Sequence, residues 1–128
     1  MNDHPLILLV DDEAHILELY QTVLLKAGFQ VVTTLNGAEA IKIAQQQHPS
    51  LILLDVQMPE MDGVEVQEKL KSDPATKGIK VVFLTAFGDL ERPEIDLSLA
   101  KDIGALDFIK KGIDLDEFIA KVHQYLAA

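Results

Sequence analysis

The sequence predicts an α/β fold in which helices cover both faces of a doubly wound, five-stranded parallel sheet. Two observations lead to this prediction. Short apolar runs alternate with helix-like segments along all 128 residues. The runs are uniformly apolar, which is typical of parallel strands that are buried on both faces. With 48% hydrophobic residues, the chain is expected to form one globular domain over residues 1–128.

The first strand is predicted at Leu6–Val10, where five apolar residues follow one another. Apolar residues then recur at helical spacing from Ile16 to Leu24, and Gly28 is a plausible C-terminal stop for this helix. The second strand is predicted at Gln30–Leu35.

Asn36-Gly37 is interpreted as a turn between the second strand and the next helix. This helix is shorter and ends before Pro49. Its apolar side is expected to hold Ala38, Ile41 and Ala44. The third strand follows at Leu51–Leu54.

A third helix is predicted over Val64–Leu70 and is closed by the turn-rich Ser72-Asp73-Pro74. Asp62-Gly63, just before it, is interpreted as a turn. The fourth strand is predicted at Val81–Leu84 and ends at Thr85.

Pro93 is expected to open a helix that runs through Leu97, Ala100 and Ile103. A short fifth strand is predicted within Leu106–Lys111. Asp114 and Glu117 have the spacing of a capping box and open the last helix. One face of that helix is expected to carry Leu115, Phe118, Ile119, Val122 and Leu126.

The composition restricts the function of the chain. Its formal net charge of −10 and pI of about 4.6 argue against direct binding to nucleic acid or to anionic membranes. Cysteine is absent, which excludes disulfides and thiolate metal sites. The N-terminal residues do not resemble a secretory signal, and no apolar run approaches the length of a membrane span. A cytoplasmic protein without membrane insertion is therefore expected.

Three aspartates stand where two of the predicted strands end. Asp11 and Asp12 follow the first strand, and Asp55 follows the third. In open parallel sheets, sites form beyond the carboxyl ends of the strands. Three carboxylates that meet there repel one another unless a cation binds, and hard oxygen ligands favour Mg²⁺ or a similar ion such as Mn²⁺. Each of the paired aspartates could alternatively cap the helix that follows.

The fourth and fifth strands also end in polar residues, Thr85 and Lys110-Lys111. A hydroxyl and an ammonium beside the acids suit phosphoryl transfer. Asp55 is the candidate nucleophile, and the other two aspartates are candidate metal ligands. Thr85 and a lysine would steady the charged oxygens of the transferred group.

At these positions the chain resembles the receiver domain of two-component response regulators, and in particular the stand-alone regulators of chemotaxis. The resemblance covers nearly the whole chain and is carried by Val10–Glu13, Asp55–Gly63, Leu84–Ala86 and Gly104–Lys111. It implies a flavodoxin-like fold with the strand order 2-1-3-4-5.

The resemblance also implies a role for each residue of the site. Asp55 would accept a phosphoryl group, Asp11 and Asp12 would bind Mg²⁺, and Gln57 would offer its backbone carbonyl to the same ion. Thr85 would be the switch hydroxyl. The resemblance further implies a catalytic lysine at Lys111, a switch aromatic at Phe108, and residues lining the phosphate at Gln57, Ala86 and Phe87.

The choice of Lys111 over Lys110 follows from the family pattern beginning at Gly104. Lys110 falls one position early, and the alternation of a strand would point it to the opposite face. The chain departs from the pattern at Gly112, where the family usually has a proline after a cis peptide bond. It also departs over Phe87–Ile103, which is a few residues longer than is common in the family.

The function implied is a phosphorylation-dependent switch rather than an enzyme, with self-catalysed phosphotransfer and autodephosphorylation. A histidine kinase or a histidine phosphotransfer protein would supply the phosphoryl group, and an unidentified protein would be the downstream target. No output domain is expected, because nothing follows the last helix. The chain would be either a stand-alone regulator or a receiver module excised from a larger one.

Two other functions remain open at this point. A phosphatase of the haloacid dehalogenase type also uses an aspartate at a strand end, but it would carry a second aspartate where Gln57 stands. A binding-only pseudo-receiver would keep the fold without being phosphorylated. The intact acids, Thr85 and Lys111 argue against a pseudo-receiver. Gly112, where the chain departs from the family pattern, is compatible with one.

Overall fold

A computed structural model of the chain describes residues 4–86 and 104–128, which form five strands and four helices. The strands are β1 (Leu6–Val10), β2 (Gln30–Thr34), β3 (Leu51–Asp55), β4 (Lys80–Thr85) and β5 (Asp107–Lys110). The helices are α1 (Ala14–Lys26), α2 (Gly37–Gln47), α3 (Gly63–Ser72) and α5 (Leu115–Ala127). The helix predicted from Pro93 lies outside the described residues.

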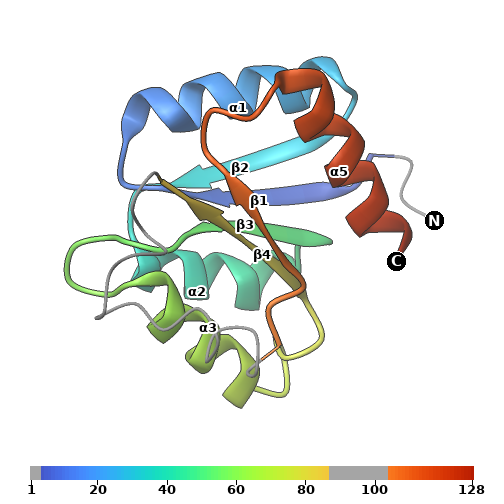
Figure 1. Ribbon diagram of the computed structural model, residues 1–128. Helices are drawn as coiled ribbons and strands as arrows, with labels where there is room; N and C mark the ends of the chain where they lie inside the picture. The colour runs from blue at the N-terminus through green and yellow to red at the C-terminus, as the bar shows by residue number, and fades with distance from the viewer. Residues whose placement is uncertain (1–3, 87–103) are drawn as a thin grey trace.

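All strand pairs are parallel, and the strand order is β2-β1-β3-β4-β5. Helices α1 and α5 cover one face of this sheet, and α2 and α3 cover the other (Figure 1). The predicted α/β fold and its strand order are therefore confirmed. None of the described helices has the length and apolar character that crossing a membrane requires.

Successive residues of each buried strand pack into two different cores. In β1, Ile7 and Leu9 join the core under α1 and α5, whereas Leu8 and Val10 join the core under α2 and α3. Side chains alternate between the two faces of a strand. A run of consecutive apolar residues is therefore what a sheet covered on both sides requires, and burial of both faces gives most of the stabilising free energy.

The start of α2 differs from the prediction. Asn36 is the N-cap, and its side chain accepts a hydrogen bond from the backbone N–H of Glu39 at 2.8 Å. Gly37 is already the first residue of the helix, so Asn36-Gly37 is not a separate turn. The prediction that Ala38 lies on the apolar side was also wrong, because Ala38 is exposed. The buried residues of this helix are Gly37, Ala40 and Ala44.

The start of α3 is corrected in the same way. Asp62 is the N-cap, accepts a hydrogen bond from the N–H of Glu65 at 2.9 Å, and is followed at once by the helical Gly63. At the ends of the chain's other elements the differences are small. The second strand stops at Thr34, one residue before the predicted end, and Leu35 is exposed.

The last helix begins as predicted. The side chain of Asp114 accepts a hydrogen bond from the N–H of Glu117 at 3.1 Å. The buried face of α5 carries Phe118, Val122 and Tyr125. Leu115 was expected on this face but is exposed at the first position of the helix.

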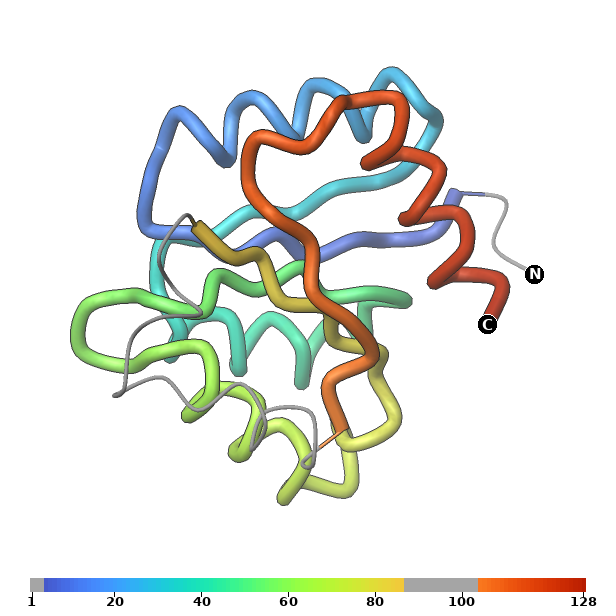
Figure 2. The backbone as a smooth tube through the Cα atoms, in the orientation of Figure 1, coloured from blue at the N-terminus to red at the C-terminus, as the bar shows by residue number. Residues whose placement is uncertain are grey.

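The parallel strands bring their carboxyl ends to one edge of the sheet. Figure 2 shows β1, β3 and β4 reaching that edge before the chain turns away. The residues at the carboxyl ends of β1, β3, β4 and β5, or directly after them, therefore share a small region, which we call the rim. It is formed by Asp11, Asp12, Asp55, Thr85 and Lys111.

Candidate functional site

The three aspartates meet at the rim as the topology requires. Val10 pairs with Leu54 in the parallel ladder, so Asp11 and Asp55 follow at neighbouring positions. Both are buried, with exposed fractions of 0% and 2%, while Asp12 is exposed. One carboxylate oxygen from each of the three lies within 4.8 Å of the others. The rim thus holds two buried acids and one that faces solvent.

The donor set at the rim fits a divalent cation. All three groups are carboxylates, the hard oxygen ligands that Mg²⁺ and Mn²⁺ prefer. One oxygen of Asp55, Oδ2, is buried and has no hydrogen-bond partner among the described residues. A buried charged oxygen without a partner is costly, and a bound cation would remove that cost.

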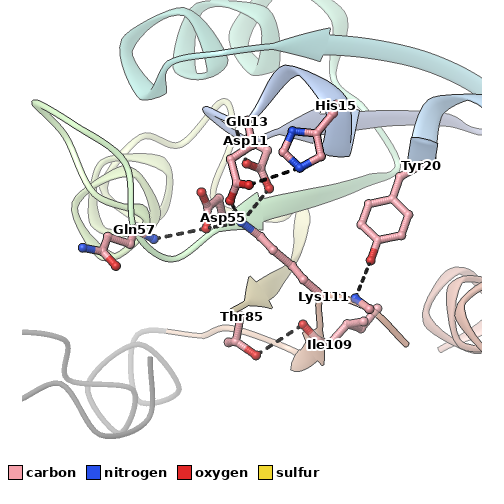
Figure 3. Close-up of polar contacts among 10 residues, drawn as sticks. Asp11, Glu13, His15, Tyr20, Asp55, Gln57, Thr85, Ile109 and Lys111 are labelled. Atoms are coloured by element: carbon pink, nitrogen blue, oxygen red, sulfur yellow. Dashed lines mark hydrogen bonds and ion pairs between the residues drawn. The ribbon is translucent and has the colours of Figure 1, made fainter. Parts of the chain in front are cut away.

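Lys111 reaches across the rim to the buried acids, as Figure 3 shows. Its Nζ lies 2.9 Å from Asp11 Oδ2 and 3.1 Å from Asp55 Oδ1. The side chain is only 9% exposed, so these ion pairs are shielded from water. Lys110, in contrast, is exposed at the end of β5. Of the two adjacent lysines, Lys111 is the one that lies with the acids.

Burial and mutual repulsion change the acidity of these groups. Burial, followed by the charge of Asp11, raises the pKa of Asp55 to about 7, although Lys111 opposes the shift. Burial also raises the pKa of Asp11, again against Lys111. Burial alone would lower the pKa of Lys111, but its hydrogen bonds and ion pairs with the two acids outweigh this and raise the pKa. The rim is short of positive charge for its acids.

Thr85 ends β4 and is buried at the same edge of the sheet. Its hydroxyl donates a hydrogen bond to the backbone carbonyl of Ile109 at 3.4 Å, near the upper limit for such a bond (Figure 3). The hydroxyl is therefore on the rim, and it is held only weakly.

The other predicted site residues lie around these groups. The backbone N–H of Gln57 donates to Asp55 Oδ1 at 3.3 Å. Phe108 is half-buried in β5 and stacks on Phe83 with ring centroids 5.7 Å apart. Ala86 directly follows β4, and Phe87 lies outside the described residues.

The structure adds Glu13 to the residues expected from the sequence. Its Oε1 lies 3.4 Å from Lys111 Nζ, and its Oε2 lies 3.4 Å from Nε2 of the exposed His15. The backbone N–H of Glu13 also donates to Asp11 Oδ1 at 2.9 Å. Neither aspartate of the pair is the N-cap of α1, since Glu13 occupies that position without a capping side chain. In the sequence, Glu13 stood out only as the residue that closes the Val10–Glu13 segment, directly after the acid pair.

Gly63 is a second residue that the sequence did not single out for the site. A Cβ at this position would collide with the backbone carbonyl oxygen of Asp55 and would lie 2.9 Å from Cε1 of Phe83. Its N–H donates to the carbonyl of Val56 at 2.8 Å. The first turn of α3 therefore packs directly against the backbone that carries Asp55.

The rim opens to solvent through a hollow of about 410 Å³. It is lined by Asp12, Glu13, Gln57, Met58 and Pro59. A group that approached Asp55 through this hollow would meet carboxylates first and Lys111 behind them. Such an arrangement suits an anionic group only when cations are present to offset the acids.

Comparison with known proteins agrees with this geometry. A profile of the response regulator receiver domain matches residues 7–123. Sporulation initiation phosphotransferase F of Bacillus subtilis (strain 168) is 36% identical over 120 residues, which cover 94% of this chain and 92% of that protein. The polar-differentiation response regulator DivK of Brucella ovis is 33% identical over 123 residues, covering 94% of each chain.

The similarity extends to solved structures. The chemotaxis protein CheY4 of Vibrio cholerae is 25% identical and superposes with a TM-score of 0.84, covering 95% of this chain and 98% of that one. These similarities span nearly the whole sequence and include the strands that end at the rim.

Proposed function

The chain belongs to the response regulator receiver family and acts as a phosphorylation-dependent signalling switch, and we propose that Asp55 is the residue that takes the phosphoryl group. The observation that carries this proposal is the state of its two oxygens. Oδ1 is held by Lys111 at 3.1 Å, whereas the buried Oδ2 has no hydrogen-bond partner among the described residues. A carboxylate that Lys111 orients through one oxygen, with the other left without a partner among the described residues, can hold a cation and still react with phosphorus.

In the proposed reaction, an Asp55 oxygen forms a bond to phosphorus. The phosphorus–nitrogen bond of a phosphohistidine breaks at the same time, and the imidazole nitrogen leaves with the electron pair and takes up a proton. Lys111 keeps Asp55 oriented before the transfer and offsets the negative charge of the phosphoryl oxygens afterwards. Burial of the site keeps these interactions strong by excluding water.

We propose Mg²⁺, or Mn²⁺ in its place, as the cofactor. Asp11, Asp12 and Asp55 would hold it, together with the backbone carbonyl of Gln57. When bound, the ion supplies positive charge that offsets both the acids and the incoming phosphoryl oxygens. Burial and then the charge of Asp11 raise the pKa of Asp55 to about 7, and a cation bound between the two acids would offset the second of these effects.

The switch would act through Thr85 and Phe108. After phosphorylation, the weakly held Thr85 hydroxyl would leave Ile109 and donate to a phosphoryl oxygen. This would change the end of β4 next to β5, where Phe108 packs on Phe83. The new charge thereby biases a local equilibrium between two arrangements.

The phosphodonor would be a histidine kinase or a histidine phosphotransfer protein, and the output would be the binding of a downstream protein. The proposal includes a cytoplasmic location for the protein. Direct contact with nucleic acid is not part of it, since the net charge is −10.

The test is incubation with a small phosphodonor, such as acetyl phosphate, and Mg²⁺, followed by intact-mass measurement. Wild-type protein should gain one phosphoryl group and Asp55→Asn should gain none. Asp62→Asn is the matched control, because asparagine caps a helix as well as aspartate does, and it should be labelled like wild type. Equal labelling of Asp55→Asn and wild type would rule out Asp55. A binding-only module would take no label and would not respond to beryllofluoride.

A further inference from the structure

The loop that carries Lys111 is held by hydrogen bonds on both sides of its backbone. The N–H of Lys111 donates to the carbonyl of Thr85 at 2.8 Å, which extends the ladder between β4 and β5. The N–H of the next residue, Gly112, donates to the hydroxyl of Tyr20 at 3.1 Å. This second bond joins the loop to α1, since Tyr20 lies in that helix, 92 residues before Gly112 in the sequence.

The backbone at Gly112 needs such a bond. Its φ of 90° is in the region that favours glycine, and a glycine loses more conformational freedom on folding than any other residue. Apart from its two chain neighbours, no heavy atom of the described residues would lie within 4 Å of a Cβ at this position, so this side of the residue faces open space. The loop also borders an open hollow of about 430 Å³. Packing therefore contributes little to holding this loop in place. The hydrogen bond from the Gly112 N–H to the Tyr20 hydroxyl contributes correspondingly more.

Tyr20 is well placed to hold the loop. It is only 1% exposed, and its ring stacks on Phe118 of α5 with centroids 4.5 Å apart. A ring clamped between two helices keeps its hydroxyl in one place. Tyr20 also belongs to the helix that follows Asp11 and Asp12, so its hydroxyl links the loop of the lysine to the element that begins at the acids.

We propose that Tyr20 is a positioning residue for phosphoryl transfer. Its hydroxyl fixes the peptide group that follows Lys111 and so keeps the ammonium between Asp11 and Asp55. This inference rests on the proposed function, since it assigns Tyr20 to the same site. The hydroxyl of Tyr20 bonds to the loop and, among the described residues, to none of the acids at the rim, so it would act through Lys111. A displacement of the ammonium by a fraction of an ångström weakens its two ion pairs with the acids.

The test compares Tyr20→Phe with Tyr125→Phe. Each variant removes one buried hydroxyl and keeps the ring. The Tyr125 hydroxyl donates to Asp107 Oδ2 at 2.6 Å, at the far end of β5 from the rim. Tyr125→Phe therefore reports the effect of losing a hydroxyl without moving Lys111. Thermal unfolding of both variants shows that the comparison is made on folded protein.

Two measurements are needed. The first is hydrogen exchange of the Gly112 amide by NMR, which reads the bond itself and does not depend on phosphorylation. We expect exchange to be at least about tenfold faster in Tyr20→Phe than in wild type, because the amide loses its acceptor. The second is the rate of labelling by acetyl phosphate with Mg²⁺. We expect this rate to fall about tenfold in Tyr20→Phe and to stay within about twofold of wild type in Tyr125→Phe.

A Lys111→Ala background separates positioning from general damage. If Tyr20 acts through the lysine, Tyr20→Phe should slow labelling by less than about twofold once the lysine is gone. The inference is overturned if Tyr20→Phe is labelled at the wild-type rate, or if it slows the Lys111→Ala protein as much as wild type. If wild-type protein itself takes no label, the proposed function fails and the inference falls with it.

Discussion

The hydroxyl of Thr85 donates a hydrogen bond to the backbone carbonyl of Ile109 across a distance of 3.4 Å. At this length the bond is weak, so the hydroxyl loses little when it turns to another acceptor. A phosphoryl oxygen on Asp55 would be a far stronger acceptor because it is charged. The resting contact therefore leaves Thr85 ready to change partners.

Thr85→Ala should weaken the response to a phosphoryl mimic. We expect the apparent affinity for beryllofluoride in the presence of Mg²⁺ to fall about tenfold or more, which corresponds to one lost hydrogen bond to a charged group. Titration followed by NMR would measure this, with the Phe108 resonances as the reporter. Thr85→Ser keeps the hydroxyl and should bind like wild type. Equal affinities of the alanine and serine variants would argue against a role for the hydroxyl.

The two adjacent lysines should behave differently. Lys111→Ala removes the ammonium that lies 2.9 Å from Asp11 and 3.1 Å from Asp55, so we expect phosphorylation by acetyl phosphate to slow by about a hundredfold. Lys110 is exposed, and Lys110→Ala should leave the rate within about twofold of wild type. Intact-mass time courses on both proteins check this, and a slower reaction in Lys110→Ala alone would contradict the assignment.

The stability of the metal-free protein should depend on pH through Asp55. Burial and the charge of Asp11 raise its pKa from 3.8 to about 7 in the folded protein. Between these values the folded state binds more protons than the unfolded state, so this group makes the free energy of unfolding fall as pH rises. The amide of Asp55→Asn cannot ionise, so the free energy of unfolding of this variant should not fall with rising pH in this way.

We therefore expect Asp55→Asn to melt on the order of 5 °C above wild type at pH 8 in the presence of EDTA. The difference should shrink as the pH is lowered toward 4, where the wild-type carboxyl is increasingly protonated. Thermal unfolding across this pH range measures it, with Asp62→Asn as the control that should track wild type. A constant difference at every pH would show that the effect is not electrostatic.

Gly63 should tolerate no side chain. Gly63→Ala would drive a Cβ into the carbonyl oxygen of Asp55 and against the ring of Phe83, and overpacking of this kind costs about 1–3 kcal/mol. Gly78 offers a matched control, because a Cβ there would meet nothing within 4 Å. We expect a clear loss in denaturant midpoint for Gly63→Ala and little change for Gly78→Ala. Equal stability of the two variants would mean that α3 can shift away from β3.

Much of the fold could be predicted because the strands are short, apolar and bounded by polar residues. Asp55 illustrates this: it ends an apolar run, and the topology of a parallel sheet then brings it beside Asp11. The helix starts were harder. Asn36-Gly37 and Asp62-Gly63 contain residue types that favour turns and N-caps equally. Burial of Gly37 and Gly63 against α3 and β3 decides in favour of the caps, and a local pattern does not contain that information.

Candidate site residues at the end of a strand could be chosen from the sequence. Residues that reach the site from other elements could not. The choice of Lys111 over Lys110 came from the family pattern that begins at Gly104, and in the structure Lys111 is the lysine that forms ion pairs with Asp11 and Asp55. Glu13 and Tyr20 could not be found in this way. Their contacts with Lys111 and Gly112 join residues that are 98 and 92 positions apart in sequence, and the packing of α1 against α5, the helix that follows this loop, brings them together.

The alternation of β5 gives this strand access to both layers of the molecule. Phe108 packs on the core under α2 and α3, while the next residue, Ile109, belongs to the core under α1 and α5. A sideways movement of β5 would therefore change the packing of helices on both sides of the sheet. Under the proposed function, one chemical event at the rim would therefore reach the packed layers on both sides of the sheet.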